Sequence, residues 1–306
     1  MDKISVVVPL YNEEKNVLLF YNSLKAVLNN MKNDHEIIFV DDGSRDRTFF
    51  YVNELNKKDK KVKAVQFQKN YGKAAALSAG FEEAKGAIII TMDGDMQDDP
   101  VEIPRFVAEL EKGYGLVSGW KQKRQDPFGK RFFSKLFNAL AAAVTGVKIH
   151  DFNCGFKVYK AKAAKTLNIY GELHRYIPAL VYWNGYKVGE IAVRHHARKY
   201  GKSKYGVSRL FKGFYDLITV KFLTGYKKKP MYLFGTVGIL LGLLGIIAAI
   251  KVLWDRYANI VSMDRPLLML SVLLIVLAVQ FISLGFIGEL ISSSSKEEYK
   301  IKKKLE

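Results

Sequence analysis

The chain has 306 residues, of which 48 are Lys or Arg and 30 are Asp or Glu, so its formal net charge is +18. An apolar fraction of 49% excludes a disordered chain, and a single cysteine, Cys154, excludes the class of small domains held together by disulfide bonds. The excess of positive charge favours a nucleic acid or an anionic membrane surface as partner, and its distribution along the chain has to decide between them.

Short apolar runs alternate with helical patterns in the N-terminal part of the chain. The runs predict strands at 3–9, 36–42, 62–67 and 87–92, and the patterns predict helices at 13–31, 46–57 and 74–84. This alternation is typical of an α/β fold with a mostly parallel sheet and right-handed crossovers. Ligands of such sheets bind beyond the carboxyl ends of the strands, where this sequence places its clusters of polar residues.

Two later segments, 130–144 and 208–222, combine aromatic side chains at helical spacing with lysines and arginines. A basic, aromatic-rich amphipathic helix beside a membrane span is typical of the headgroup layer of a bilayer. We therefore expect two interfacial helices. The alternative is that both helices pack on the core of their own domain.

Two apolar runs, 231–254 and 266–291, contain one charged residue each, Lys251 and Glu289. At a rise of about 1.5 Å per residue, each run is long enough as a helix to cross a hydrocarbon core of about 30 Å. Because neither run has a polar face, we expect a transmembrane hairpin rather than two buried helices of a soluble domain.

The charges that flank these runs predict how the chain is oriented. Lysines at 227–229 precede the first span and lysines at 302–304 follow the second, whereas the charges of the connector 255–265 balance. The positive-inside rule then predicts an integral protein of the plasma (cytoplasmic) membrane with both termini in the cytoplasm. Residues 1–225 would form a cytoplasmic domain, and residues 226–306 a membrane domain with a basic cytoplasmic tail.

The sequence Asp93-Gly94-Asp95 follows the fourth predicted strand directly. Two carboxylates at this spacing can face one hard divalent cation, which prefers oxygen ligands, and Gln97 is close enough in sequence to assist. Mg²⁺ or Mn²⁺ held there would neutralise a diphosphate leaving group. The alternative is an Asx turn that ends the strand.

Polar residues also follow the first two predicted strands and open the third predicted helix. Asp42 is placed to accept hydrogen bonds from a nucleobase or a ribose, or else to cap the helix that begins at Asp46. Tyr11 offers a stacking face and Glu13 an acceptor for sugar hydroxyls, while Lys73 at a helix start favours an anion. The sequence has neither a P-loop motif nor the glycine motif of dinucleotide-binding folds.

Four segments at characteristic spacing, VPLYNEEKN, VDDGSRDRT, NYGKAAALSAGFEEAKG and MDGDMQDDPVEIP, together resemble family 2 glycosyltransferases, which have the Rossmann-like GT-A fold. The likeness continues through VSGWKQKRQD, DFNCGFKVY, GELHRYIPAL and RKYGKSKYG and the two apolar runs. The whole set resembles polyprenyl-phosphate glycosyltransferases, among them the dolichol-phosphate mannose synthases and the bactoprenol glucosyltransferases. The resemblance implies a GT-A catalytic domain followed by the two membrane spans.

The resemblance also implies roles for residues at matching positions. Asp93, Asp95 and Gln97 would hold the metal, and the nucleotide-sugar would be bound by Pro9, Tyr11, Glu13, Asp42, Lys73, Asp93, Gly94 and Asp95. The donor diphosphate and the acceptor phosphate would be held by Arg124, Arg131, Arg198, Ser203 and Lys204. The alternative for these basic residues is a solvated surface that attracts anionic lipid. Gly94 replaces the alanine that is more usual in the family, and we expect the loss of one methyl to leave the metal site intact.

The acceptor determines the expected mechanism. A lipid monophosphate is already an anion near neutral pH, so its oxygen needs little activation by a base. The enzyme has to bring two negative molecules together and stabilise the departing diphosphate, and we expect Asp95, Asp151 and Arg131 to be catalytic. The resemblance implies inversion by direct displacement. Asp151 would orient the acceptor or the sugar, or else cap its loop, and Glu172 and His174 are rival acid–base candidates.

The sequence therefore favours metal-dependent, inverting transfer of one sugar from a nucleotide-sugar to undecaprenyl or dolichyl phosphate at the cytoplasmic membrane face. A UDP-sugar is the favoured donor and GDP-mannose the other, and no nucleic-acid partner is expected. One alternative is a processive polysaccharide synthase, although the Gln-x-x-Arg-Trp motif of such enzymes does not occur here. The other is a non-catalytic membrane adaptor with a basic surface, which leaves the strand-end carboxylates unexplained.

Four glycines of the first apolar run, Gly235, Gly238, Gly242 and Gly245, form a stripe of small residues. Such a stripe permits close contact between membrane helices. We favour contact with the second span of the same chain. Contact between subunits, in a dimer or a tetramer, is the alternative.

Overall fold

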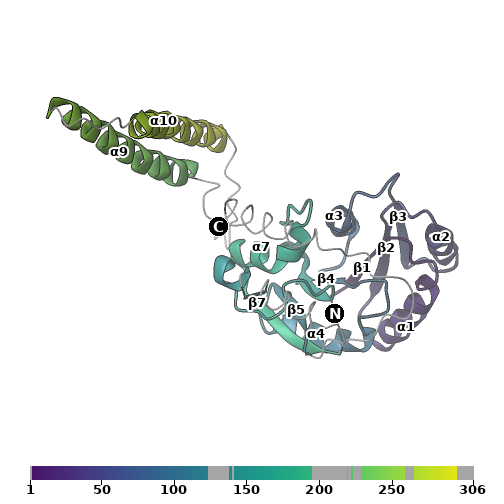
Figure 1. The fold of residues 1–306 in the computed structure, drawn as a ribbon. Coiled ribbons are helices and arrows are strands. Elements are labelled where there is room, and N and C mark those ends of the chain that lie inside the picture. Colours follow the sequence, from purple (N-terminus) through teal and green to yellow (C-terminus); the bar gives the residue numbers. More distant parts are fainter. Residues whose placement is uncertain are drawn as a thin grey trace. The chain divides into compact units, whose positions relative to one another are not determined.

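The computed structural model describes residues 2–122, 138–139, 141–194, 219, 222, 229–258 and 265–294. The chain divides into two units, Met1–Val220 and Lys221–Glu306, and each is described by itself (Figure 1). The first unit is an α/β structure. The second contains a pair of long helices.

The α/β unit is built on a seven-stranded sheet with the order β3-β2-β1-β4-β6-β5-β7 in the described part of the chain. Its strands are β1 (Ile4–Leu10), β2 (His35–Asp41), β3 (Val62–Gln66), β4 (Ile88–Thr91), β5 (Leu116–Lys121), β6 (Lys157–Lys160) and β7 (Val188–Val193). β6 runs antiparallel to its neighbours β4 and β5, whereas the other pairs of strands are parallel. The expected mostly parallel α/β sheet is confirmed.

Helices cover both faces of this sheet (Figure 1). They are α1 (Val17–Asn30), α2 (Thr48–Lys58), α3 (Lys73–Glu83), α4 (Ile103–Glu111), α6 (Ala161–Ala164) and α7 (Ile177–Trp183), with short 3-10 helices at Pro100–Glu102 and Leu173–Tyr176. In β1, Val6 and Val8 join the core formed with α1, α2 and α4, whereas Val7 joins the core formed with α3, α6 and α7. Because both faces are covered, β1 has apolar side chains on both faces, with Ser5 as its one polar residue.

The four strands and three helices predicted for the N-terminal part are all present, with shifted ends. The largest shift is at α1, which begins at Val17 rather than at Glu13. The backbone amide of Glu13 donates to Thr48 Oγ1 at 2.8 Å, and its carboxylate accepts from Asn16 Nδ2 at 2.7 Å. These contacts hold the residues before Val17 in a turn against the start of α2.

The two segments expected to be interfacial are only partly described. In the first, residues 138–139 and 141–145 are helical, and in the second, residues 219 and 222 are helical. Ala141 is fully buried in the same core as α3 and α7. The end of the first segment thus packs on the core of its own unit, as the alternative interpretation proposed, and the rest of both segments lies outside the described residues.

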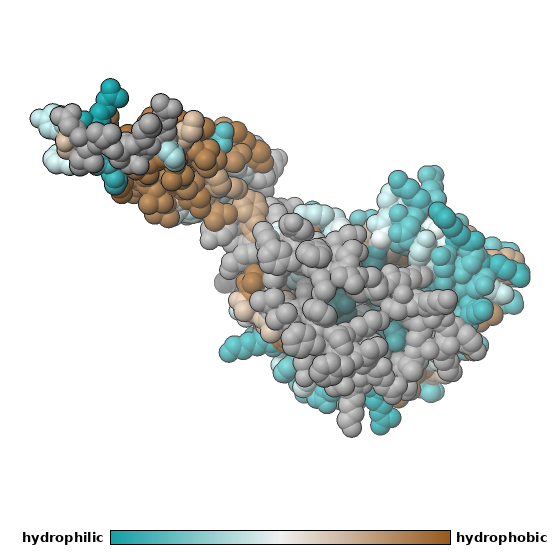
Figure 2. Space-filling model, in the orientation of Figure 1, coloured by the Kyte–Doolittle hydropathy of each residue, from teal (hydrophilic) through white to brown (hydrophobic). Residues whose placement is uncertain are grey.

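The second unit contains α9 (Pro230–Tyr257) and α10 (Arg265–Ser294), each long and apolar enough to cross a membrane. In the most apolar windows of these helices, only 17% and 11% of the residues are buried. Apolar side chains therefore cover the outside of the pair, which is brown in Figure 2. Buried core helices of a soluble domain would not expose these side chains, so the pattern favours the membrane interpretation.

The two helices pack antiparallel through the glycine stripe. A Cβ on Gly238 would lie 2.9 Å from the carbonyl oxygen of Ala278, and a Cβ on Gly245 would lie 3.1 Å from that of Ser271. Only residues without a side chain allow the backbones to approach this closely. The stripe is therefore used between α9 and α10 of one chain.

One polar contact joins the ends of the hairpin. Glu289, near the end of α10, accepts a hydrogen bond from the backbone amide of Met231, in the first turn of α9, at 3.4 Å. The carboxylate thus faces the partially positive N-terminus of the neighbouring helix. Close by, a Cβ on Gly288 would lie 2.8 Å from the Cβ of Pro230, so the backbones also nearly touch at this end.

We predict that Gly238→Ala destabilises the hairpin by about 1–3 kcal/mol, because the new methyl would meet backbone atoms of α10 that cannot move aside. Gly242→Ala is the matched control, since a Cβ there would meet Ala278 Cβ at an ordinary contact distance of 3.4 Å. Thermal unfolding of the full-length protein in detergent measures both changes. Equal midpoints for the two variants would show that the glycine stripe does not hold the helices together.

Candidate active site at the carboxyl ends of the strands

The loops that follow β1, β2 and β4 meet at one edge of the sheet because these strands are parallel and adjacent. Leu10 at the end of β1 lies opposite Asp41 at the end of β2. The loops are then joined by hydrogen bonds: the amide of Asn12 donates to Ser44 Oγ, and the amide of Arg45 donates to Asn12 Oδ1, both at 2.8 Å. The polar clusters predicted from the sequence are thus brought together.

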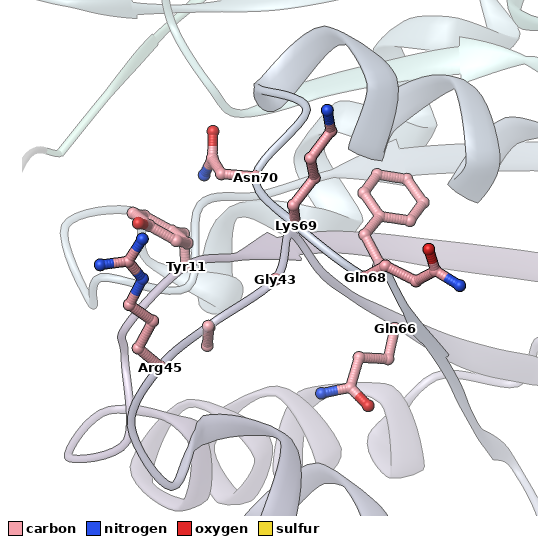
Figure 3. Close-up of a pocket in the computed structure, with 9 residues that line it drawn as sticks. Tyr11, Gly43, Arg45, Gln66, Gln68, Lys69 and Asn70 are labelled. Atoms are coloured by element: carbon pink, nitrogen blue, oxygen red, sulfur yellow. The ribbon is translucent and has the colours of Figure 1, made fainter.

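A cavity of about 360 Å³ opens between the loops that follow β1, β2 and β3 (Figure 3). It is lined by Tyr11, Gly43, Ser44, Arg45, Gln66, Phe67, Gln68, Lys69 and Asn70. The lining offers two aromatic rings, two cationic groups and several side-chain amides. Pro9 and Glu13 flank Tyr11 in the chain and are half-buried. Of the predicted nucleotide-binding residues, Tyr11 lines this cavity directly.

Asp42 is buried beside the cavity and holds the loop that leads into α3. Its Oδ1 accepts from the amide of Tyr71 at 2.7 Å, and its Oδ2 accepts from the amide of Gly72 at 3.0 Å. Burial raises the pKa of Asp42 and nearby Asp41 adds to the rise, although the two amides act in the opposite direction. The interpretation of Asp42 as a helix cap is wrong, because Asp46 accepts the amide of Thr48 at the start of α2.

Asp93 and Asp95 lie just beyond β4. Asp93 Oδ1 accepts from Lys73 Nζ at 2.5 Å. Burial opposes ionisation of Asp93, but the charge and the hydrogen bond of Lys73 outweigh it and lower its pKa to about 2. Asp95 is buried, and its Oδ1 accepts from the amide of Gln97 at 3.2 Å, which is the geometry of an Asx turn. A carboxylate that closes such a turn keeps the capacity to accept further contacts.

Gly94, between the two aspartates, also affects how the loop after β4 packs. A Cβ there would lie 2.3 Å from Cδ2 of Leu10, which is buried at the end of β1. The glycine therefore allows the loop after β4 to lie close against β1. That the glycine leaves the metal site intact stays a prediction.

Two lysines near Asp93, the half-buried Lys121 and the buried Lys157, were not identified from the sequence. Lys121 Nζ lies 3.0 Å from Oδ1 of the fully buried Asp98, and Lys157 donates to the carbonyl oxygen of Cys154. Burial lowers the pKa of Lys157 to about 8, whereas the pKa of Lys121 is raised because Asp98 outweighs its burial. β6 has the sequence KVYK, with a lysine at each end, so the sequence carries no signal that one of the two is buried.

Cys154 lies in the same region and is buried, and this burial raises the pKa of its thiol to about 12. It is therefore a packed thiol rather than a nucleophile.

Asp151, a predicted catalytic residue, lies in the loop before β6 and is buried. Its Oδ1 accepts from the amide of Asn153 at 3.2 Å, so it does cap its loop as the alternative proposed. The loop is held from outside by Glu190 of β7, which accepts from the amides of His150 and Asp151 at 2.8 and 3.0 Å and from His150 Nδ1 at 2.7 Å. The His150 ring in turn stacks on Trp120 of β5, with ring centroids 4.1 Å apart.

The remaining candidates divide into two groups. Arg124, Arg131, Arg198, Ser203 and Lys204 lie outside the described residues. Glu172 is paired with Arg175, which accounts for its charge, and His174 lines a narrow gap together with Lys73 and Lys157. Among the described residues, no group of three or more His, Cys, Asp or Glu side chains is arranged to hold a metal ion.

The family model described as glycosyl transferase family 2 matches residues 5–167, which span the strands from β1 to β6 and include Asp42, Asp93, Asp95 and Asp151. The chain belongs to this family. The resemblance drawn from the sequence motifs is thereby confirmed, and the strand-end loops form the candidate active site of a glycosyltransferase.

Two curated relatives match nearly the whole of this glycosyltransferase. A dodecaprenyl-phosphate galacturonate synthase from Rhizobium johnstonii is 39% identical, with 95% of this chain and 88% of the relative covered. An undecaprenyl-phosphate 4-deoxy-4-formamido-L-arabinose transferase from Pseudomonas fluorescens is 35% identical, with 94% and 84% covered. Both alignments are too long for the catalytic unit alone, so they extend into the helical hairpin.

A solved structure shares the fold. Glucosyl-3-phosphoglycerate synthase from Mycobacterium tuberculosis, in complex with Mn²⁺, uridine diphosphate and phosphoglyceric acid, superposes with a TM-score of 0.56 at 19% identity. The match covers 72% of this chain and 78% of the other. The expected GT-A architecture is confirmed.

We predict that Glu190→Ala lowers the glycosyltransferase rate by about 10- to 100-fold, because the loop that carries Asp151 loses three hydrogen bonds and shifts. Glu190→Gln, which keeps an oxygen acceptor, should retain more activity. Sugar transfer by the full-length variants in detergent, together with their melting temperatures, measures the effect. A fall in melting temperature without a fall in rate would show that Glu190 only stabilises the fold.

Proposed function

We propose that this glycosyltransferase transfers one sugar from a nucleotide-sugar to a polyprenyl phosphate at the cytoplasmic face of the plasma membrane. The observation that carries the proposal is the combination, in one chain, of acidic strand-end loops beside a polar cavity with an apolar helical hairpin. The two curated relatives, whose names specify dodecaprenyl and undecaprenyl phosphate, support this acceptor. Because the relatives match this chain almost end to end, the support extends to the membrane hairpin.

The cavity is the proposed site of the donor's nucleoside. Tyr11 would stack on the base, and Asp42 and Glu13 would accept hydrogen bonds from the base and the ribose. Pro9 would shape the strand end from which Tyr11 projects. Because Asp42 already fixes the loop before α3, a nucleoside that binds Asp42 would also be positioned against the N-terminus of that helix.

The donor set at the end of β4 fits a hard divalent cation. Asp93 and Asp95 supply carboxylate oxygens and Gln97 an amide oxygen, which are the ligands that Mg²⁺ and Mn²⁺ prefer. Oxygens of the donor diphosphate would complete the coordination, which accounts for the small number of protein ligands. When bound, the metal would neutralise charge on the departing diphosphate. The Mn²⁺ and uridine diphosphate named for the Mycobacterium structure support a metal of this kind.

The residues of the chain would then orient the two substrates. Lys73 and the α3 N-terminus favour the donor diphosphate, and Arg124, Arg131, Arg198, Ser203 and Lys204 are proposed to hold the phosphates of donor and acceptor. Asp151, fixed through Glu190, would orient the sugar or the acceptor. The acceptor phosphate is already anionic, so its oxygen can attack the anomeric carbon from the face opposite the diphosphate, with inversion. Asp95, Asp151 and Arg131 are the proposed catalytic residues.

Residues 1–225 are proposed to lie in the cytoplasm with both termini, and residues 226–306 in the membrane, on the basis of the flanking lysines. The glycine stripe is used within the hairpin, so a dimer or tetramer, which stays a prediction, would need another surface. A processive synthase needs enough membrane helices to form a channel for its product, and two spans are too few for that. Membership of a glycosyltransferase family disfavours the non-catalytic adaptor.

We predict that Asp95→Asn lowers sugar transfer to undecaprenyl phosphate by about 100-fold or more, because a ligand that places charge at the diphosphate is lost. The measurement is transfer of labelled sugar to lipid by the full-length protein in membranes. Asp34→Asn is the control, since this exposed aspartate precedes β2 at the opposite end of the sheet. Transfer at the normal rate by Asp95→Asn would refute the metal site.

We predict that a panel of nucleotide-sugars identifies a UDP-sugar as the donor, with GDP-mannose as the competing outcome. Release of UDP or GDP by the purified full-length protein, with and without undecaprenyl phosphate, distinguishes them. A UDP-sugar should give lipid-dependent release that EDTA abolishes. Long saccharide products instead of a single transferred sugar would favour the processive synthase.

A further inference from the structure

We propose that Lys73 couples metal binding to nucleotide binding. In this proposal, which rests on the function proposed above, the Lys73 ammonium competes with the cation for Asp93 and passes to the donor diphosphate when both ligands bind. Metal and nucleotide would then bind cooperatively, and each would bind weakly alone. The proposal follows from what surrounds the two carboxylate oxygens of Asp93.

Lys73 and Gly155 approach Asp93 from two sides. Asp93 Oδ1 is 2.5 Å from Lys73 Nζ, within hydrogen-bond distance. Asp93 Oδ2 lies against the backbone of Gly155, where even a Cβ would come within 2.4 Å of it. The Asp93 side chain is 30% exposed. A cation that binds Oδ1 therefore competes with the Lys73 ammonium for that oxygen, whereas one that binds Oδ2 meets the backbone before β6. Moving a side chain costs less than moving a packed loop.

Lys73 is also the lysine that is best able to move. Its side chain is 29% exposed, and it is the first residue of α3, directly after Gly72 with a φ of 93°. Lys121 is only 11% exposed and is paired with Asp98, and Lys157 is buried in β6 with the Cys154 carbonyl as its partner. These two lysines are fixed by their surroundings, so they remain when Lys73 leaves.

The charges explain why the metal alone would bind weakly. A divalent cation at Asp93 would displace the Lys73 ammonium. The displaced group would remain in a region that already contains the positive charges of Lys121 and Lys157, both of which act on Asp93. The displaced Lys73 needs an anion, and the diphosphate supplies one beside the α3 N-terminus, which favours negative charge. The exchange leaves every charge paired only when cation and diphosphate arrive together. By linkage, the nucleotide then tightens the metal as much as the metal tightens the nucleotide.

The test measures Mn²⁺ binding to the full-length protein in detergent by electron paramagnetic resonance, with and without UDP or GDP. For the unmodified protein, one of the two nucleotides should tighten Mn²⁺ binding by about 10-fold or more. Lys73→Met should bind Mn²⁺ alone about 5-fold more tightly or better, and should lose the part of the coupling that Lys73 supplies, while the direct contact between metal and diphosphate keeps the rest. Lys73→Arg keeps the charge and should resemble the unmodified protein.

Lys63→Met is the matched control. Lys63 Nζ lies 2.8 Å from Glu36 Oε2 and its side chain is 30% exposed, nearly the same as that of Lys73, but it lies outside the site. This variant should leave Mn²⁺ binding unchanged. The proposal is overturned if Lys73→Met binds Mn²⁺ alone no more tightly than the unmodified protein, or keeps the full coupling.

A separate outcome distinguishes failure of the proposed function. Asp95→Asn should abolish nucleotide-dependent Mn²⁺ binding if the metal site is correct. If Mn²⁺ binds equally well to Asp95→Asn, or if neither nucleotide changes Mn²⁺ binding in any variant, the metal and donor site is itself misplaced. If Asp95 is required but Lys73→Met behaves like the unmodified protein, the site stands and the coupling role of Lys73 is wrong.

Discussion

The parallel pairing of β1 with β2 on one side and β4 on the other is the constraint on which the candidate site depends. It brings Tyr11, Asp42 and Asp93 to one edge of the sheet although they are far apart in the sequence. The same pairing buries carboxylates, which is unfavourable unless cations or amides compensate them. Lysines from α3, β5 and β6 and the amides before α3 provide that compensation. The acidic strand ends therefore account for these buried and half-buried lysines.

Much of this arrangement could be predicted from the sequence because it depends on local patterns. Apolar runs and helical periodicity gave the first four strands and their helices, and the rule for parallel sheets gave the edge at which ligands bind. The antiparallel β6 and the lysines at 121 and 157 could not be predicted. Their positions depend on which distant strands become neighbours, and a lysine in the sequence usually indicates a solvated surface. The role of Glu190 was missed for the same reason.

Several carboxylates of the site hold a turn or a loop and are also proposed to bind substrate or metal. These two roles are compatible. Asp95 closes an Asx turn, Asp151 caps its loop and Asp42 fixes the loop before α3. Each of these contacts limits the motion of the carboxylate and thereby fixes where its remaining acceptor capacity points. A binding site for a charged substrate benefits from such fixed groups, because they need not be ordered when the substrate arrives.

The contact between Glu289 and Met231 has a consequence for the membrane. Together with the glycine contacts, it fixes the helices of the hairpin in a single register, since a slide by one turn would break all of them. Lys251, near the far end of α9, is then held at a set distance from this contact, about 30 Å at the rise of an α-helix. In a bilayer, these two charged positions define the hydrocarbon thickness that the hairpin matches without tilting. Membranes of different thickness would therefore tilt the hairpin as one rigid body rather than bend its helices separately.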